Sequence, residues 1–457
     1  MRRLARFSSL LLTLSLVALA LLAGPARAAS PTSYLPGEVI VKLNLASDLP
    51  AVAATYALNP VPISQFGSVP IYRLAILDGT DPAVKAASML ADLRVIYADV
   101  DQIGAVPESR DISWAMGGGT AFGFVTQWAG PQINVPAALT VSTGVNTTVA
   151  VLDTGIDPTH PALAGHLLPG YDFVDGDADP TEVGIPGVNM PYGHGTHVAG
   201  LVAYTAPGAK IMPLRVLDPN GVGNTWVLVE ALQYAMNPTD PANKPADVIN
   251  LSLSTLADNR LVRDALGAVT CEEAVHVTGN LPCFRADGHG AVVVAAAGNS
   301  ASTQAEYPAA DPVHGILSVA ASTQQDTLAP FSNSGSWVDV EAPGVSILST
   351  VPGGQYAWWS GTSMATPLAA GEAALVRSVY PTLNAQGVVQ RIMVTSTRVN
   401  SQVPLRINAA AAVGAPTLSL TPFAPLATSG TSALSPTSGS SSTTPSFGPS
   451  RKGREGS

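Results

Sequence analysis

The residues Thr148-Val149-Ala150-Val151-Leu152, followed at once by Asp153-Thr154-Gly155, decide the fold class of this chain. The first five are apolar or β-branched and do not alternate with polar residues, which is typical of a strand buried on both faces. Similar runs recur at 211–217, 248–253, 291–296 and 316–320, and helical patterns are clearest at 226–235 and 363–379. We therefore predict an α/β fold, a three-layer sandwich with a mostly parallel central sheet over residues 112–413.

The first 28 residues have the pattern of a secretory signal peptide. Arg2, Arg3 and Arg6 precede an apolar run that ends before Ala26-Arg27-Ala28, a small-residue cleavage pattern. The run is short for a membrane span, which needs about 20 residues. We expect a secreted protein without stable membrane insertion; an uncleaved anchor is the alternative.

A small α+β domain is predicted over residues 34–107. Strands are expected at 38–43, 71–76 and 95–98, and a helix from Pro82 to Leu93, with the proline in its first turn. No catalytic combination of residues occurs within this segment.

Composition limits the remaining possibilities. The 457 residues are 46% hydrophobic and 12% charged, with a net charge of −10, which argues against nucleic-acid binding.

Residues 414–457 are rich in Ser, Thr and Pro and cannot bury a core, so a disordered tail is predicted, with cell-surface association open. Cys271 and Cys283 are too few for a disulfide scaffold; export allows them to bond, and two free thiols are the alternative.

Three short strings carry the residue types of nucleophilic catalysis. They contain Asp153, His194 within His194-Gly195-Thr196-His197, and Ser363 within Gly361-Thr362-Ser363-Met364-Ala365. A serine needs a base within hydrogen-bond reach, and a carboxylate orients the histidine that serves as that base. Reacting groups in open α/β sheets collect at the carboxyl ends of the strands. We therefore predict a Ser-His-Asp triad.

A fourth string, Ala295-Ala296-Ala297-Gly298-Asn299, ends in an amide just after a predicted strand. The amide N–H of Asn299, together with the backbone N–H of Ser363, is expected to bind an oxyanion.

In this order the four strings resemble the subtilisin-type serine proteases, or subtilases. The resemblance implies a serine endopeptidase that acts through an acyl-enzyme on protein or peptide substrates. It also implies that residues 34–107 form an inhibitory pro-domain whose tail lies in the cleft, with Arg110 a candidate processing residue.

The resemblance further implies where a substrate binds. Ser252, Leu253 and Ser254 would pair with the peptide on one side, and Gly221 and Gly223 on the other. Gly298 and Glu306 would line the pocket for the side chain before the cleaved bond. A carboxylate there would favour Lys or Arg; the alternative is that Glu306 points to water.

Four aspartates lie close together before His194: Asp172, Asp175, Asp177 and Asp179. Because calcium prefers carboxylate oxygen ligands, this spacing predicts a structural calcium site. Their string also resembles a calcium loop of some subtilases, and a solvated acidic turn is the alternative. No cofactor is expected to be required for the chemistry.

Other functions remain open or are disfavoured. An aspartic protease is disfavoured because Asp153-Thr154-Gly155 has no second copy. His197 is interpreted as a buried structural histidine rather than a metal ligand. A proteolytically silent binding module and a peptide ligase stay as alternatives, since the ligase would use the same residues.

Overall fold

The fold is described from a computed structural model, which covers residues 33–110, 116–271, 281–285 and 287–415. All of these residues belong to one compact unit. The predicted signal peptide and almost all of the predicted tail lie outside the described residues. In the part of the chain that is described, no helix is both long and apolar enough to cross a membrane.

A small antiparallel sheet is formed by the N-terminal residues. Its elements are β1 (Glu38–Leu43), β2 (Ser64–Gln65), β3 (Ile71–Ala75) and β4 (Val95–Asp99), with helices α2 (Leu49–Thr55) and α3 (Pro82–Met89). The strand order is β2-β3-β1-β4. The predicted strands are confirmed, whereas α2 and β2 were not predicted.

The predicted helix from Pro82 to Leu93 is wrong at its C-terminal end, because α3 ends at Met89. The Asp92 carboxylate accepts a 2.9 Å hydrogen bond from the Arg94 backbone N–H and also binds the Arg94 guanidinium. An aspartate that bonds the backbone two residues later favours a turn over helix. Leu93 consequently lies 93% exposed.

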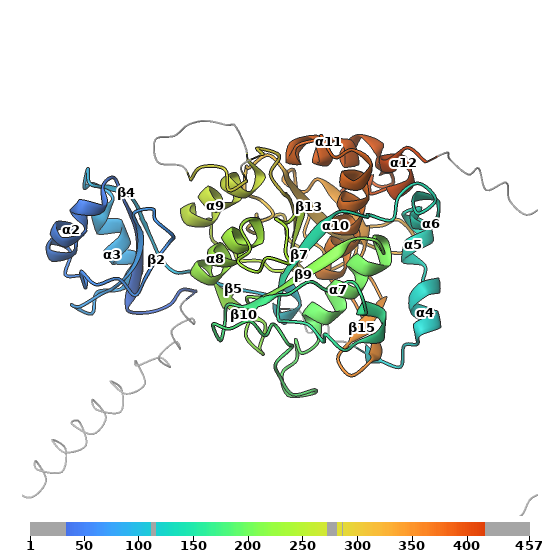
Figure 1. Ribbon diagram of the computed structural model, residues 1–457, viewed down its shortest axis with the longest axis horizontal. Helices are drawn as coiled ribbons and strands as arrows, with labels where there is room; N and C mark the ends of the chain where they lie inside the picture. Colours follow the sequence, from blue (N-terminus) through green and yellow to red (C-terminus); the bar gives the residue numbers. More distant parts are fainter. Residues whose placement is uncertain (1–32, 111–115, 272–280, 286, 416–457) are drawn as a thin grey trace, which may run out of the picture. The chain divides into compact units, whose positions relative to one another are not determined.

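The large central sheet, as far as the chain is described, has nine strands. They are β7 (Thr148–Asp153), β8 (Tyr171–Asp172), β9 (Lys210–Arg215), β11 (Val248–Leu251), β12 (Val292–Ala296), β13 (Ile316–Ser322), β14 (Val340–Pro343), β17 (Thr397–Arg398) and β18 (Leu405–Arg406). The order is β17-β18-β14-β13-β12-β11-β7-β9-β8, and all pairs except β17–β18 are parallel. The predicted mostly parallel sheet is confirmed (Figure 1).

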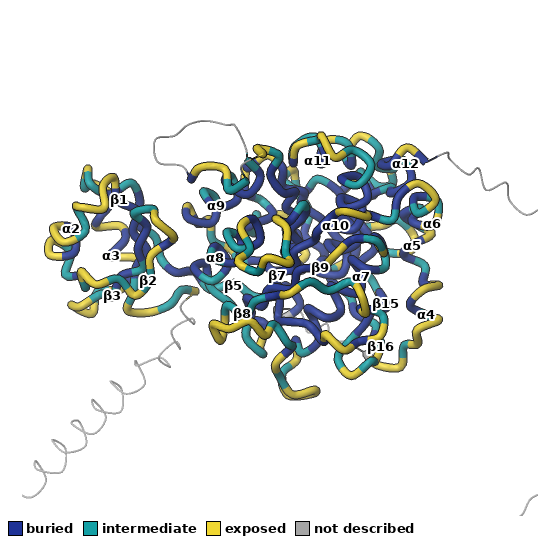
Figure 2. Tube along the Cα trace, in the orientation of Figure 1, coloured by how far each residue is buried: buried dark blue, intermediate teal, exposed yellow. Residues whose placement is uncertain are grey.

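Helices cover both faces of this sheet. They are α7 (His194–Thr205), α8 (Thr225–Met236), α9 (Arg260–Thr270), α10 (Thr362–Val379), α11 (Ala385–Thr395) and α12 (Ala409–Val413). Alternate residues of β7 point to opposite layers: Val149 and Val151 belong to one hydrophobic cluster with residues of α7 and α10, whereas Ala150 and Leu152 belong to another with residues of α8. This alternation makes the three layers, and Figure 2 shows β7 and α10 as buried.

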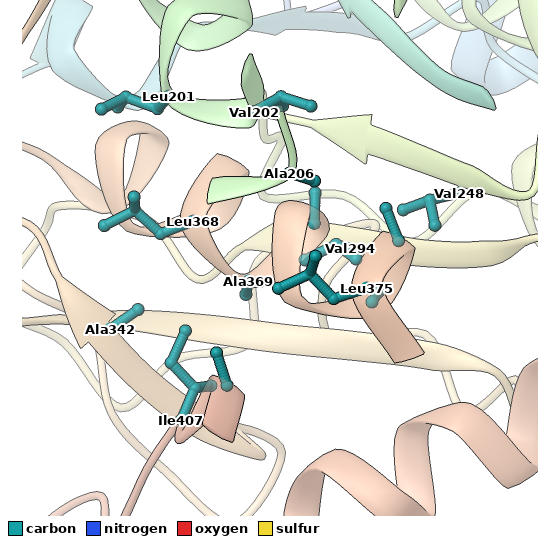
Figure 3. Packing of buried hydrophobic residues seen from close by; sticks show 14 of the residues in the cluster. Leu201, Val202, Ala206, Val248, Val294, Ala342, Leu368, Ala369, Leu375 and Ile407 are labelled. Atoms are coloured by element: carbon teal, nitrogen blue, oxygen red, sulfur yellow. The ribbon is translucent and has the colours of Figure 1, made fainter. Parts of the chain in front are cut away.

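The layer beneath α10 is packed from small and branched side chains. Figure 3 shows Leu368 and Leu375 of α10 together with Leu201 of α7 and with Val248 and Val294 of the sheet. Fully burying one Val or Leu side chain is worth about 1.5–3 kcal/mol, so this layer holds α10 against the sheet.

Shorter elements complete the described chain. They are η1 (Ala46–Asp48), β5 (Ile103–Ala105), η2 (Pro107–Arg110), β6 (Met116–Gly117), α4 (Ala121–Thr126), α5 (Ala129–Gln132), α6 (Val135–Ala138), η3 (Pro161–Leu163), β10 (Val222–Asn224), β15 (Ile347–Val351) and β16 (Gln355–Trp359). Strand β5 pairs with β10, and β15, β16 and β6 form a three-stranded sheet. Cys271 and Cys283 are disulfide-bonded, with Cα atoms 4.7 Å apart, so the free-thiol alternative is wrong.

Candidate active site

The predicted triad residues stand where strands end and helices begin. Asp153 is the last residue of β7, His194 is the first residue of α7, and Ser363 is the second residue of α10. β7 lies inside the sheet, between β11 and β9, and α7 and α10 both pack on the same face of that sheet. The C-terminal end of β7 and the N-terminal ends of the two helices therefore meet at one edge of the sheet.

Asp153 and His194 form a short buried hydrogen bond. His194 Nδ1 lies 2.7 Å from Asp153 Oδ1, and that oxygen also accepts a 2.7 Å bond from the Thr154 backbone N–H. Both side chains are almost fully buried. With Nδ1 engaged by a carboxylate, the Nε2 atom of the imidazole is directed toward Ser363 and its surroundings.

The carboxylate of Glu108 occupies the space between the histidine and the serine. Ser363 Oγ donates to Glu108 Oε2 over 2.8 Å, and His194 Nε2 lies 3.3 Å from the same oxygen. The other oxygen, Oε1, accepts a 3.0 Å bond from Asn299 Nδ2. Glu108 therefore contacts Ser363, His194 and Asn299 at once, and its side chain is fully buried.

Sequence reasoning missed Glu108. Its one signal was its position directly after Pro107, the predicted end of the N-terminal domain. No motif surrounds it, and only the path of the chain brings it to Ser363.

The amide of Asn299 is oriented by α10. Its Oδ1 accepts bonds of 2.9 Å from both the backbone N–H and the hydroxyl of Thr362. Because the oxygen is held there, the Nδ2 donor must face the site. Asn299 follows β12, which places it at the same sheet edge as Asp153.

Charge pairing changes the pKa values in this cluster. Burial opposes the charged imidazole, but the carboxylates of Asp153 and Glu108 outweigh that effect and raise the pKa of His194 to about 10. Burial likewise disfavours a charged Glu108, yet the bonds from His194 and Ser363 lower its pKa below the ordinary value. The arrangement is thus an ion pair of Glu108 carboxylate and His194 imidazolium.

The residues before Glu108 lie in a groove as an added strand. β5 pairs antiparallel with β10, with Gly104 opposite Gly223, and Val106 N–H donates to Gly221 O over 3.0 Å. On the other side, Ala105 and Ser254 exchange backbone bonds of 3.1 and 2.9 Å. The two edges expected to bind a substrate therefore hold a segment of the chain itself.

Ser252 and Leu253 also lie beside this segment. The Ser252 hydroxyl donates to the Ser363 carbonyl over 3.0 Å, and the Ser252 carbonyl accepts a 3.3 Å bond from Ser363 Oγ. Leu253 lines an apolar cavity together with Leu228 and Val262, next to Gly104. Gly104 has no side chain to fill that cavity.

Glu306 is buried, with 1% of its surface exposed, so the alternative that it points to water is wrong. Its carboxylate accepts bonds from Ser254 Oγ (2.7 Å), Ser300 Oγ (3.0 Å) and Asn333 Nδ2 (2.9 Å). A Cβ atom at Gly298 would lie 2.5 Å from Glu306 Oε2. A glycine at 298, where φ is +98°, therefore leaves the room that this carboxylate occupies.

The carboxylates of the four predicted calcium ligands do not gather as one ligand group. Arg215 forms ion pairs with both Asp172 and Asp175, and Asp172 Oδ1 also accepts bonds from two backbone N–H groups. Asp177 Oδ1 accepts from the Asp179 backbone N–H instead.

Within the described ranges, no three His, Cys, Asp or Glu side chains gather as a metal-ligand group. A calcium ion would have to displace Arg215, so the residues as placed do not fit it. Linear spacing showed the carboxylates but not that Arg215, at the end of β9, faces them.

His197 is a buried structural histidine, as interpreted from the sequence. Its Nε2 lies 3.1 Å from the Ala357 carbonyl oxygen, and burial lowers its pKa to about 3. Arg110, the candidate processing residue, has a side chain outside the described residues.

The fold and this site define a class of protein: a three-layer α/β protein with an aspartate, a histidine and a serine at the carboxyl edge of its parallel sheet. The model of peptidase S8, the subtilase family, matches residues 144–414, more than half of the chain. The chain belongs to the subtilase family, which confirms the resemblance found in its motifs.

Individual relatives agree with this assignment. The chain is 42% identical over 240 residues to the thermophilic serine proteinase of Bacillus sp. (strain AK1), covering 50% of this chain and 52% of that protein. It is 38% identical over 266 residues to thermitase of Thermoactinomyces vulgaris, covering 56% and 84%. A solved protease of Pseudoalteromonas arctica PAMC 21717 is 30% identical with a TM-score of 0.54, covering 64% of this chain and 98% of that one. The first of these matches thus spans about half of the relative's length.

Proposed function

We propose that this chain is a secreted serine endopeptidase made as an inactive precursor. Ser363 is the nucleophile, His194 the general base and then acid, Asp153 the residue that orients His194, and Asn299 an oxyanion donor. The observation that carries the proposal is the 2.7 Å Asp153–His194 bond, together with the approach of His194 and Ser363 to one oxygen atom.

The chemistry follows from these positions once Glu108 has left. His194 Nε2 takes the proton of Ser363 as its oxygen attacks the peptide carbonyl, and Asp153 stabilises the resulting imidazolium. Asn299 and the Ser363 backbone N–H bind the oxyanion. The tetrahedral species collapses to an acyl-enzyme as His194 protonates the leaving amine, and water then releases the acid by the reverse proton path.

Residues 34–107, in this proposal, are an intramolecular inhibitor. The β5 strand fills both substrate edges, and the Glu108 carboxylate occupies the place of a developing oxyanion. A substrate would bind along the same edges as an added strand. The signal peptide at 1–28 would direct export, and the tail from 414 has no assigned role.

Substrate selection is assigned to two features beside the groove. The cavity next to Gly104 would take a large apolar side chain of the substrate. Glu306, reached past Gly298, would favour a Lys or Arg side chain before the cleaved bond, because a carboxylate pairs with a guanidinium or ammonium group. We assign no step to calcium, because Arg215 already engages Asp172 and Asp175.

The test is expression of the full chain and of its Ser363→Ala form, followed by N-terminal sequencing. Processing of the unmodified chain alone is the expected result. If both forms are processed identically, or if neither is processed and the chain cleaves no peptide, the chain is a silent binding module instead. Incubation with a mixture of peptides, followed by mass spectrometry of the products, distinguishes hydrolysis from ligation.

A further inference from the structure

Helix α7 begins at the histidine of the site without a cap of its own. Its N-cap residue is Gly193, which has φ of +90° and offers no side-chain hydrogen bond. The first backbone N–H groups of any helix lack partners within that helix. Those of Gly195 and Thr196 therefore need acceptors from elsewhere.

Two residues distant from α7 supply these acceptors. The Thr154 hydroxyl accepts a 3.0 Å bond from Gly195 N–H, and Glu182 Oε2 accepts 3.2 Å and 2.8 Å bonds from the backbone N–H and hydroxyl of Thr196. The Thr154 hydroxyl in turn donates to Glu182 Oε1 over 2.5 Å. One buried carboxylate thus bonds both the residue after Asp153 and the third residue of the helix that carries His194, while Thr154 itself bonds the second residue.

The backbone around Glu182 is itself held against the end of β7. Ile156 N–H donates to Pro180 O and Glu182 N–H to Ile156 O, each over 2.9 Å. The strand end and the helix start are also in close contact, since a Cβ atom at Gly195 would lie 2.1 Å from the Gly155 carbonyl oxygen. Glu182 cannot follow α7 if that helix shifts, because its own segment is paired with 154–156.

We propose that Glu182 is a positioning residue: through Thr154 and Thr196 it fixes the start of α7 against the end of β7 and so sets the Asp153–His194 hydrogen bond. The expected effect on kcat rests on the proposed function, whereas the effect on the Asp153–His194 hydrogen bond does not. Small displacements of a catalytic group are costly, because a misplacement of about 1 Å can reduce a rate about 100-fold.

The first experiment is kinetic and uses the processed enzyme, with active sites counted by titration so that only folded molecules are compared. Glu182→Ala and Thr154→Val are expected to lower kcat about 10- to 100-fold while KM changes less than twofold. Thr154→Ser keeps the hydroxyl and is expected to restore kcat. Glu341→Gln removes another buried carboxylate, on β14, and serves as the matched control with unchanged kcat. An unchanged kcat per titrated site in Glu182→Ala overturns the proposal.

The second experiment needs no activity. In the Ser363→Ala precursor, the His194 Nδ1 proton, held at 2.7 Å from Asp153, is read by its far-downfield NMR resonance. Glu182→Ala is expected to shift and broaden that resonance, and Glu341→Gln to leave it in place. An undisturbed resonance in Glu182→Ala contradicts the positioning role even if the protein proves not to be a peptidase. Loss of peptidase activity in the parent chain with the expected NMR change would overturn only the proposed function.

Discussion

Ser363 donates a 2.8 Å hydrogen bond to Glu108, a residue that precedes it by 255 positions. In the proposed reaction, Ser363 would have to give the proton of this bond to His194 before it could attack a substrate. A side-chain carboxylate, rather than a peptide bond, thus lies at Ser363, and in the proposed function this contact would keep the site closed.

Replacing Glu108 by Gln or Ala is expected to weaken this closure. Hydrogen bonds to charged groups contribute about 1.5–3 kcal/mol, which corresponds to about 10- to 100-fold faster labelling of the precursor by a fluorophosphonate. Glu38→Gln, a change on β1 away from the site, is the control. Equal labelling rates for the parent and both Glu108 variants would show that the carboxylate does not limit access to Ser363.

The stability of the folded precursor is expected to depend on pH in both directions. The folded-state pKa of His194 is raised from 6.5 to about 10, so its stabilising effect is complete below pH 6.5 and is lost as pH rises through about 10. The pKa of Glu108 is lowered from 4.5, so its effect is present above pH 4.5 and is lost as pH falls below that value. NMR titration of the Ser363→Ala precursor should give a raised His194 pKa that falls in Glu108→Gln. A His194 pKa unaffected by that change would refute the ion pair.

Much of this architecture was accessible from the sequence. Unbroken apolar runs such as Val149–Leu152 identified the buried parallel strands, and the predicted helix at Ser363 forms as α10. The contacts of Glu108 and Arg215 were not accessible, because each depends on a partner far along the chain. A residue's type and spacing indicate what it can do, whereas its partners are set by packing, which the linear order does not show.

The buried carboxyl group of Glu372, in α10, predicts that the free energy of unfolding also depends on pH. Glu372 is fully buried, and desolvation raises its pKa from 4.5 to about 8. The unfolded chain loses this proton above pH 4.5 while the folded chain keeps it, so stability falls with rising pH up to about pH 8, by at most about 1.4 kcal/mol per pH unit. Glu372→Gln should flatten the pH dependence measured by urea unfolding, and Asp240→Asn should not. The idea fails if the unfolding free energies of parent and Glu372→Gln change equally between pH 5 and pH 8.

Glu306 predicts the preferred residue before the cleaved bond. Glu306→Gln keeps the shape of the side chain but removes its charge, so kcat/KM for Lys and Arg peptides should fall about 10- to 100-fold relative to Leu peptides. Glu341→Gln is the matched control. Equal kcat/KM values of the parent enzyme for basic and apolar peptides would show that Glu306 does not determine the preferred residue.

The apolar cavity next to Gly104 predicts a second substrate preference. Peptides with Leu or Phe at the position that pairs with Gly223 should show a higher kcat/KM than peptides with Gly there, since filling an apolar pocket is worth about 1–3 kcal/mol. Kinetics on a peptide series that varies only this residue tests the expectation. A preference for Gly at this position would mean that the cavity beside Gly104 is not used by substrates.

The most direct test of the account is the reaction of the processed chain with a fluorophosphonate, with the modified residue located by mass spectrometry. We predict a single adduct on Ser363 that forms rapidly in the parent and is lost in folded His194→Ala. Absence of an adduct from the folded, processed chain, or an adduct on another residue at the same rate, would contradict the assignment of Ser363, His194 and Asp153 as one catalytic unit.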